Sequence, residues 1–353
     1  MHISKLRLNS FRNFKTKLLE FSPKTTVIVG PNASGKTNIL ESLYVLSTGK
    51  SFKARLEEEM INYSKDIARV KGRVKKDGET IDLEAVLTRG LVDIGASRPE
   101  KIARKKLLVK GVSKRLIDFT GNLKVTLFGP WDLDLVTESP SLRRRFLDSV
   151  LFQVDREYRR ASLSYEKGLR QRNRLLLRIR EEGTPRSQLL FWDKLLIKNG
   201  DYLSAKRGEL IEFINKNPSL NKEKFELEYD RSAISEARLE QYAEEEIAAA
   251  TTLVGPHRDD FIFKEEKRDL AKFGSRGEQR MAVLWLKLAE LAFIEKISGE
   301  RPTLLLDDIL SELDHSHRKV VMKVSDKQQT IITTADPHFV QDFKGVERIK
   351  LKD

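Results

Sequence analysis

The spacing of apolar positions changes along the chain and predicts strands first and helices later. RVKGRV (69–74) and TIDLEAVL (80–87) alternate apolar and polar residues, and Asp77-Gly78 between them is a turn signal, so together they predict a hairpin. Further strand candidates lie at 25–29, 106–111 and 124–128. The opening part of the chain is therefore expected to form mixed sheets around a first helix that starts near residue 36.

A helical period begins after Ser139. Pro140 suits the first position of a helix, and Phe146 and Val150 belong to the apolar stripe that follows. Later elements are predicted at 224–230 (strand), 235–250 (acidic helix), 276–292 (long helix), 304–308 (strand) and 330–334 (strand). This order predicts an α/β protein with an inserted, mainly helical lobe. We expect the segments 1–125 (first part of an ATPase lobe), 126–270 (the inserted lobe) and 271–353 (the rest of the ATPase lobe).

The stretch GPNASGKTN satisfies the P-loop pattern G-x-x-x-x-G-K-[ST] in full. Glycines let backbone N–H groups turn toward phosphate oxygens, the lysine reaches the β and γ phosphates, and the threonine hydroxyl ligates Mg²⁺. A buried strand precedes the stretch and an amphipathic helix follows it, so the phosphates would lie at a helix N-terminus. We therefore predict a site for ATP and Mg²⁺ formed by Gly30, Pro31, Asn32, Ala33, Ser34, Gly35, Lys36, Thr37 and Asn38.

A second buried strand ends in two acidic residues, as a P-loop metal site requires. In PTLLLDDIL (302–310), Asp307 is expected to ligate Mg²⁺, and Asp308 to orient or deprotonate the attacking water. An apolar strand that ends in acids can also simply mark a sheet edge, but beside a P-loop it indicates a nucleotide site. The two motifs lie much farther apart than one βαβ unit needs, which again predicts a large insertion.

Composition and charge narrow the class of partner. The 353 residues include 66 Lys and Arg against 53 Asp and Glu, a formal charge of +13 that favours a polyanionic partner such as nucleic acid. There is no cysteine, which excludes disulfides, thiolate nucleophiles and cysteine-based metal sites. The N-terminal stretch lacks the apolar core of a signal peptide, and no run is long enough to span a membrane. We expect a cytoplasmic protein without a membrane partner.

The stretch SRGEQ (275–279) opens the long helix that leads to LLLDD. Ser275 and the backbone of Gly277 lie at the helix start, where N–H groups and the helix dipole suit a γ-phosphate. A plain capping box formed by Ser275 and Glu278 is the alternative. SRGEQ resembles the signature of ATP-binding-cassette proteins, which caps the nucleotide held by the P-loop of a second subunit. By the same resemblance, Asp314 in SELD matches the D-loop aspartate and would contact that subunit.

The whole chain resembles the RecF family of bacterial DNA replication and repair ATPases. The stretches that carry the resemblance are LRLNSFRNF, GKTNILESLYVLSTGKSF, DLDLVTESPSLRRRFLD, LVGPHRDD and QRMAVLWLKLAEL. The resemblance implies a P-loop head like those of SMC proteins, dimerisation on ATP and slow hydrolysis stimulated by DNA, so that the ATPase acts as a switch. It also implies binding of double-stranded or gapped DNA without sequence specificity, and cooperation with RecR, and with RecO, in placing RecA on gapped DNA.

The sequence departs from the family pattern in three places. Asn32-Ala33 stands where the family usually has NG, SRGEQR (275–280) where it often has SQGQQR, and Pro130-Trp131-Asp132-Leu133 where it usually has PEDL. The altered signature affects the expected hydrolysis rate and the contact with a second subunit more than it affects nucleotide binding.

Arginines and lysines recur through the inserted region and could follow DNA phosphates. They are Arg143, Arg144, Arg145, Arg156, Arg159, Arg160, Arg170, Arg172, Arg174 and Arg178, with a second run at Lys101, Arg104, Lys105, Lys106 and Lys110. The alternative is a set of ordinary ion pairs with neighbouring glutamates. The sequence favours DNA contact for some of these residues without indicating which.

Other functions remain open on the residues alone. A P-loop enzyme of another class, such as a nuclease or a nucleotide-dependent transferase, would use ATP for chemistry on a substrate. An SMC-type structural clamp would need heptads far longer than the helices predicted here. His257-Arg258-Asp259 is similar to a kinase catalytic loop, but the other kinase motifs are missing.

Overall fold

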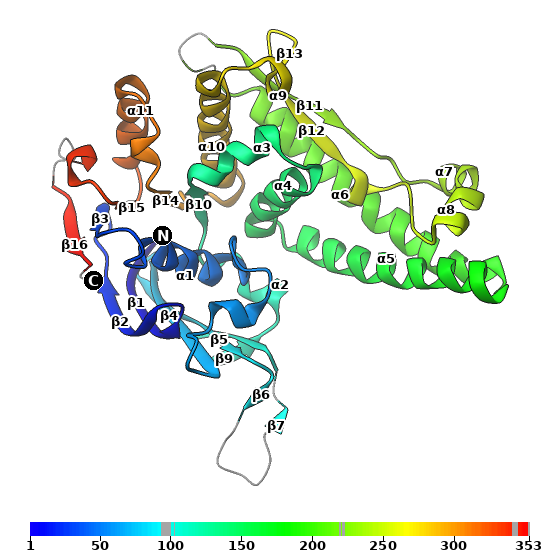
Figure 1. Cartoon of the computed structure of the whole chain (residues 1–353), viewed down its shortest axis with the longest axis horizontal. Helices are drawn as coiled ribbons and strands as arrows, with labels where there is room; N and C mark the ends of the chain where they lie inside the picture. Colours follow the sequence, from blue (N-terminus) through cyan, green and yellow to red (C-terminus); the bar gives the residue numbers. More distant parts are fainter. Residues whose placement is uncertain (93–99, 102, 219, 221–222, 341–344, 352–353) are drawn as a thin grey trace. The chain divides into compact units, whose positions relative to one another are not determined.

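The structure is a computed structural model, and it describes residues 1–92, 100–101, 103–218, 220, 223–340 and 345–351. The chain forms two compact units (Figure 1). One comprises Met1–Asp132 together with Ile294–Asp353, and the other comprises Leu133–Phe293. The helical unit is thus inserted into the chain of the first. Its bounds differ from the predicted segment 126–270. It starts at Leu133, and it ends later because it includes SRGEQ and most of the long helix after it.

The first unit contains a six-stranded antiparallel sheet in the order β2-β1-β4-β5-β8-β9. Its strands are β1 (His2–Phe11), β2 (Phe14–Glu20), β4 (Ile67–Lys76), β5 (Glu79–Thr88), β8 (Lys105–Val109) and β9 (Val112–Lys114). The predicted hairpin is the β4–β5 pair, and both of its turn residues, Asp77 and Gly78, have positive φ. That conformation matches the right-handed twist of the two strands.

A separate parallel sheet of the first unit has the order β10-β14-β15-β3-β16. Its strands are β3 (Thr25–Val29), β10 (Val125–Phe128), β14 (Thr303–Asp307), β15 (Thr330–Thr334) and β16 (Glu347–Lys350). The strand predicted at 124–128 therefore does not join its sequence neighbours but pairs with β14. The pattern of apolar and polar residues in a strand indicates which of its faces are buried but not which strand it pairs with. The sequence therefore did not show that these strands form two separate sheets.

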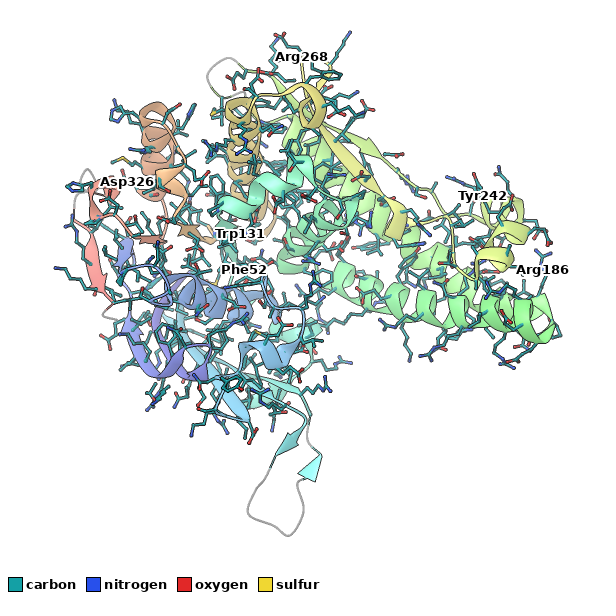
Figure 2. The ribbon with its side chains drawn as sticks, in the orientation of Figure 1. Phe52, Trp131, Arg186, Tyr242, Arg268 and Asp326 are labelled. Carbon is teal, nitrogen blue, oxygen red and sulfur yellow. The ribbon has the colours of Figure 1, made fainter. Side chains whose placement is uncertain are left out.

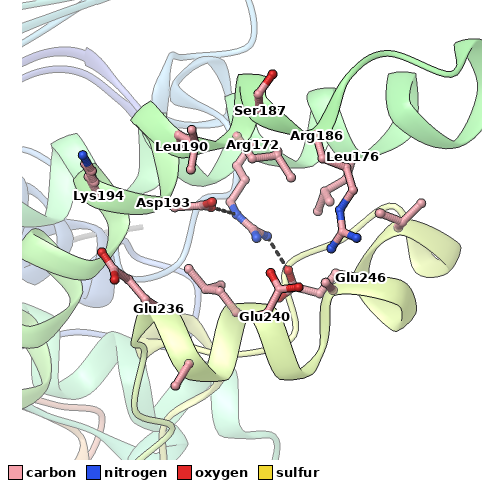
Figure 3. A pocket seen from close by; sticks show the side chains of 15 residues that line it. Arg172, Leu176, Arg186, Ser187, Leu190, Asp193, Lys194, Glu236, Glu240 and Glu246 are labelled. Carbon is pink, nitrogen blue, oxygen red and sulfur yellow. Dashed lines mark hydrogen bonds and ion pairs between the residues drawn. The ribbon is translucent and has the colours of Figure 1, made fainter.

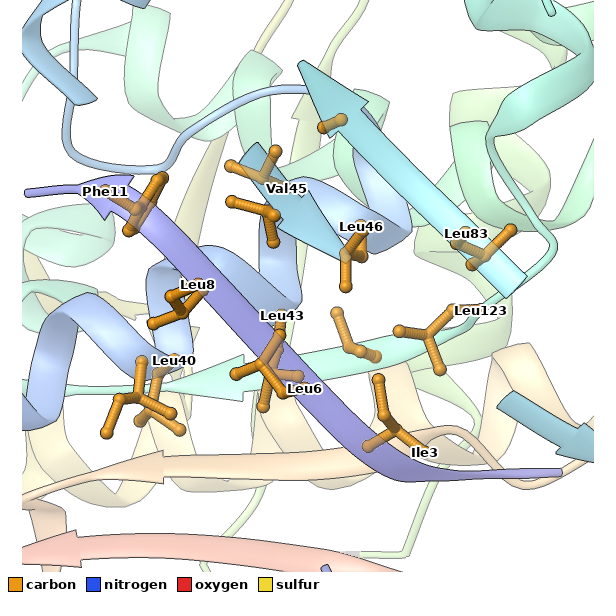
Figure 4. Packing of buried hydrophobic residues seen from close by; sticks show 14 of the residues in the cluster. Ile3, Leu6, Leu8, Phe11, Leu40, Leu43, Val45, Leu46, Leu83 and Leu123 are labelled. Carbon is orange, nitrogen blue, oxygen red and sulfur yellow. The ribbon is translucent and has the colours of Figure 1, made fainter. Parts of the chain in front are cut away.

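Helix α1 (Lys36–Thr48) lies between these two sheets. The predicted face, Ile39, Leu43 and Leu46, is fully buried, and so are Leu40 and Val45 on the other sides of the helix. Figure 4 shows this packing against the inner face of β1. At about 25 cal/mol per Å² of apolar surface removed from water, such burial fixes the start of α1 relative to both sheets.

Smaller elements complete the first unit. They are β6 (Leu91–Val92), β7 (Glu100–Lys101), α2 (Leu116–Phe119), α11 (His315–Ser325) and the 3-10 turns Glu57–Met60, Pro130–Leu133, Ile309–Ser311 and Pro337–Val340. Trp131, where the family usually has glutamate, stacks on Phe52 with ring centroids 4.9 Å apart (Figure 2). The side chain of Lys101 lies outside the described residues.

The inserted unit is mainly helical, with one small sheet β11-β12-β13. Its elements are α3 (Asp134–Thr137), α4 (Pro140–Val154), α5 (Arg156–Glu182), α6 (Leu190–Asn215), β11 (Phe225–Asp230), α7 (Glu236–Gln241), α8 (Ala243–Ala249), β12 (Asp260–Glu265), β13 (Arg268–Asp269), α9 (Leu270–Phe273), α10 (Arg276–Ser298) and the 3-10 turns Arg186–Leu189 and Pro256–Arg258. The longest, α5, is capped by Asp155 and ended by Gly183 in the left-handed conformation. Within the described residues, no helix combines the length and apolarity needed to cross a membrane.

Candidate nucleotide-binding site

The predicted P-loop connects the end of β3 to the start of α1. Gly35 caps the helix with φ 95° and no side-chain cap, so the first-turn N–H groups of α1 are left for a ligand. A Cβ at Gly35 would lie 2.6 Å from Cζ of Phe14 and 2.7 Å from the amide of Asn13, so a larger residue would have to displace both side chains as well as adopt a positive φ. Ala33 also has positive φ, at 65°. A non-glycine residue adopts that conformation at a cost of about 1 kcal/mol.

The Lys36 ammonium lies inside the loop. Its Nζ donates hydrogen bonds of 2.8 Å each to the carbonyl oxygens of Gly30 and Pro31. The side-chain oxygen of Ser34 is buried and has no hydrogen-bond partner. A buried cation, an unpartnered hydroxyl and free helix N–H groups are complementary to phosphate oxygens. The residues present therefore fit a nucleotide polyphosphate.

Asp307, at the end of β14, is buried beside this loop. Its Oδ1 accepts a 2.5 Å hydrogen bond from the hydroxyl of Thr333 on the neighbouring strand. Burial raises the pKa of Asp307, whereas hydrogen bonds from Thr333 and from Thr37 lower it, and the charges of Asp308 and Lys36 act in opposite directions. The structure thus brings Lys36 and Thr37 close to Asp307 and Asp308, although the two pairs lie far apart in the sequence. A carboxylate and a hydroxyl are the oxygen ligands that Mg²⁺ uses beside nucleotide phosphates.

Asp308 has a left-handed backbone conformation, which is uncommon for residues other than glycine. Its φ is 51°, its N–H donates to the carbonyl of Thr333 across 3.1 Å, and its own carbonyl accepts from the hydroxyl of Ser311 across 2.7 Å. Strained non-glycine residues concentrate at functional sites, where surrounding bonds hold them in place.

The turn between β1 and β2 supports the loop from the other side. Arg12 makes a bidentate ion pair with the fully buried carboxylate of Glu41 on α1, at 2.6 and 2.8 Å. Asn13 donates to the carbonyl of Ser34 across 3.3 Å and accepts from the amide of Asn38 across 2.9 Å. These contacts and Thr333 were missed from the sequence. The position of Thr333 could have been inferred, because adjacent parallel strands end at the same sheet edge.

Of the three remaining predicted residues, Ser275, Gly277 and Asp314, the first and the last cap helices. Ser275 and Glu278 form a reciprocal capping box at the start of α10, with Glu278 accepting from the Ser275 N–H at 2.6 Å and Ser275 accepting in return at 3.2 Å. The capping role considered as an alternative is therefore present, while Ser275 and Gly277 remain exposed. Asp314 caps α11 by accepting from the N–H of His317 across 3.0 Å, and its side chain is largely exposed.

Comparison with known proteins identifies the family. The chain matches the RecF/RecN/SMC N-terminal domain over residues 2–353. It is 36% identical to the DNA replication and repair protein RecF of Lachnoclostridium phytofermentans, over 99% of this chain and 97% of that protein. The chain belongs to the RecF family. It is also 35% identical to the RecF protein of Chloroflexus aurantiacus, over 100% of this chain and 98% of that protein.

Solved structures agree with this membership. The structure of the recombination mediator protein RecF-ATP in the RecFOR pathway matches with a TM-score of 0.87 at 30% identity, covering 99% of this chain and 95% of that chain. An SMC head bound to the winged-helix domain of ScpA matches with a TM-score of 0.53 at 16% identity, which shows a shared fold. The prediction of an SMC-like P-loop head with an inserted helical lobe is confirmed.

The LVGPHRDD stretch of this RecF-family chain is a structural centre of the inserted unit. Asp259 is fully buried and accepts hydrogen bonds from Arg207, Tyr229 and Ser204. His257 lies between the hydroxyl of Tyr165 and the carbonyl of Thr252, at 2.8 and 3.0 Å. Because a carbonyl can only accept, Nε2 carries the hydrogen and Nδ1 accepts from the tyrosine. This stretch therefore ties together α5, α6 and β11.

Several of the arginines considered for DNA contact have partners within the inserted unit. Arg143 is buried and makes a bidentate pair with Asp260, at 2.6 and 2.8 Å. Arg172 is buried between Asp193 and Glu246, at 2.7 Å from each, in the hollow of Figure 3. Arg159 (bonded to a carbonyl), Arg160 and Arg178 also have internal partners. Within the described part of the chain, Arg145, Arg170 and Arg174 are exposed and make no ion pair.

Proposed function

We propose that this protein binds ATP and Mg²⁺ at the P-loop and uses them to change its hold on DNA during recombinational repair and replication. The observation that carries the proposal is the convergence of Lys36, Thr37, Asp307 and Asp308 at one end of α1. Membership of the RecF family supports the proposal. The similarity to a relative whose solved structure is described as RecF-ATP supports it too.

Each residue has a role that follows from its chemistry. Lys36 would leave the carbonyls of Gly30 and Pro31 for the β and γ phosphates, while the α1 N–H groups bind the same oxygens. Thr37 and Asp307 would hold Mg²⁺, which neutralises phosphate charge when bound. Asp308 would orient the attacking water. The resulting hydrolysis is slow and serves as a switch.

Dimerisation on ATP completes the proposal. Ser275 and Gly277 of a second copy would face the γ-phosphate, and Asp314 would contact that copy. In the free chain the Glu278 carboxylate covers the N–H of Ser275, so it would have to yield when the phosphate arrives. The ordering of the dimer by ATP would then control binding of duplex or gapped DNA.

The pathway named for the solved relative supports RecR as a partner, with RecO, in placing RecA on gapped DNA. The formal charge of +13 supports contacts with phosphates that do not depend on sequence. The full-length similarity to RecF proteins supports this function over a nuclease, a transferase or a structural clamp.

The test is fluorescence anisotropy of a labelled gapped duplex with the wild type and Lys36→Met, with and without ATP and Mg²⁺, at two salt concentrations. Light scattering on the same samples reports the oligomeric state. We expect DNA binding and dimerisation that require ATP and are lost in Lys36→Met, whereas Lys50→Met, an exposed change just beyond α1, retains both. ATP-stabilised dimers of Lys36→Met would refute the composite site, and DNA binding indifferent to ATP would refute the switch.

A further inference from the structure

The outer face of the antiparallel sheet carries cations at successive outward positions. Along β4, the exposed Arg69, Lys71, Arg73 and Lys75 alternate with buried residues. On β1, Lys5 and Arg7 flank the buried Leu6 in the same way. Because side chains in a strand alternate between faces, these six cations share the face opposite to the core.

Two pairs of these cations are direct cross-strand neighbours. The β1–β4 register sets Lys5 opposite Arg73 and Arg7 opposite Lys71. Directly opposed side chains have Cβ atoms only about 5 Å apart, and like charges at that separation destabilise a sheet. Two such pairs in succession are unfavourable for folding alone, unless anions neutralise them.

The carboxylates of the face neutralise only part of this charge. Asp82 serves two cations at once, Arg73 at 2.9 Å and Lys71 at 3.6 Å. Glu84 lies directly opposite Lys71 on β5 and pairs with Arg69 at 3.1 Å. Lys5 pairs with Glu20 at 2.9 Å, at the margin of the face. Within the described residues Arg7 makes no ion pair, although its side chain is exposed.

A shallow hollow of about 360 Å³ lies over these cations. It is lined by Lys5, Arg7, Lys71 and Arg73, together with Asp82, Thr16, Leu18 and Gly72. The lining holds four cations and one carboxylate, and Glu20 beside it pairs with Lys5, so the hollow keeps a net positive charge. All of its lining belongs to β1, β2, β4 and β5, so it is a feature of the sheet itself.

We propose that this outer face binds the sugar–phosphate backbone of double-stranded DNA, with Arg7 and Lys71 at its centre. The proposal rests on the proposed DNA-binding function and assigns it a surface. Outward cations recur about every 7 Å along a strand and about 5 Å across strands, so several can reach phosphates of one duplex segment. Single-strand sites also provide aromatic side chains for base stacking. The hollow has none, which favours a duplex.

The test uses Arg7→Gln/Lys71→Gln, with Lys319→Gln/Lys323→Gln on α11 as a control of equal charge change. Anisotropy of a blunt duplex and of a single strand is measured with ATP and Mg²⁺ over a salt series. We expect the first variant to lose about tenfold or more in duplex affinity, and its slope of log K against log salt to fall by about two, since each phosphate contact contributes about 0.9. Its melting temperature should stay close to that of the wild type, because the loss of the cross-strand repulsion offsets the loss of the Lys71–Asp82 pair.

A charge-retaining variant, Arg7→Lys/Lys71→Arg, separates charge from packing and should bind like the wild type. If the wild type binds duplex but Arg7→Gln/Lys71→Gln has the affinity and slope of the control, the surface is wrong while the proposed function stands. If only single-strand binding is lost, the duplex assignment is overturned. If the wild type binds no DNA, the proposed function fails and this inference with it.

Discussion

Thr333 donates a 2.5 Å hydrogen bond to the carboxylate of Asp307 from the neighbouring parallel strand, at the register position directly opposite. The bond orients a carboxylate that burial makes costly to ionise, because burial is the largest influence on the pKa of Asp307 and raises it. Ionising Asp307 therefore costs more free energy in the folded protein than in the unfolded chain.

This relationship predicts opposite effects of Asp307→Asn on stability and on binding. With the folded pKa raised, stability falls as pH rises through that pKa, so at neutral pH the charged form is a cost that asparagine removes. We expect a higher melting temperature without nucleotide and loss of Mg²⁺-dependent ATP binding by about tenfold or more. Thermal melting and titration with a fluorescent ATP analogue measure the two effects, with the exposed Asp326→Asn as control. A lower melting temperature would contradict the argument.

Ser275→Ala separates capping from contact in trans. Loss of the cap should cost about 1 kcal/mol, and the same loss is expected for Ser235→Ala, which removes the matching cap of α7. Only Ser275→Ala should also lose ATP-dependent dimers in light scattering. Equal dimerisation of the two variants would leave Ser275 with its capping role alone.

Arg207 is the central cation of the inserted unit. It is buried and contacts Asp148 at 2.8 Å and the fully buried Asp259 at 3.0 Å. Arg207→Met removes the cation that both carboxylates contact, which should lower the free energy of unfolding by about 3–5 kcal/mol. Its neighbour Lys206 is paired with Glu209 near the surface, so Lys206→Met should cost less than about 1 kcal/mol. Urea unfolding followed by circular dichroism compares them, and similar midpoints would show that the buried pair contributes little.

His257 makes the inserted unit sensitive to acid. Burial lowers its pKa to about 4, so between that value and the ordinary 6.5 the unfolded chain takes up a proton that the folded chain does not. Stability should therefore fall as pH is lowered from 7 to 4, by up to about 3 kcal/mol from this group. His257→Gln should flatten the pH dependence of the urea midpoint, whereas the exposed His315→Gln should not. Parallel curves for His257→Gln and the wild type would exclude this origin.

The sequence predicted most of the elements because their patterns are local. The β4–β5 hairpin follows from alternation and Asp77-Gly78, and the P-loop from its own spacing. The start of α10 follows from its capping residues. The pairing of β10 with β14 was not predictable in this way, because the partner lies far along the chain and both strands are simply apolar.

The roles of charged residues were harder to predict than the strands. Arg143 pairs with Asp260, which lies more than a hundred residues away in the sequence. Partners sought among acidic residues close in sequence therefore did not include Asp260. Conversely, the sequence gives no sign that Arg7 and Lys71 belong to one surface, since each is a single cation in an alternating strand. Only the register places them side by side.

The position of β3 in the parallel sheet affects the stage of synthesis at which the nucleotide site can form. The strand that leads into the P-loop is synthesised early, yet both of its neighbours, β15 and β16, come from the last part of the chain. A growing polypeptide on the ribosome therefore carries the phosphate-binding sequence long before it has the sheet that orients it. ATP capture becomes possible only after β15 and β16 have been synthesised, so a chain that stops before them cannot act as a nucleotide switch.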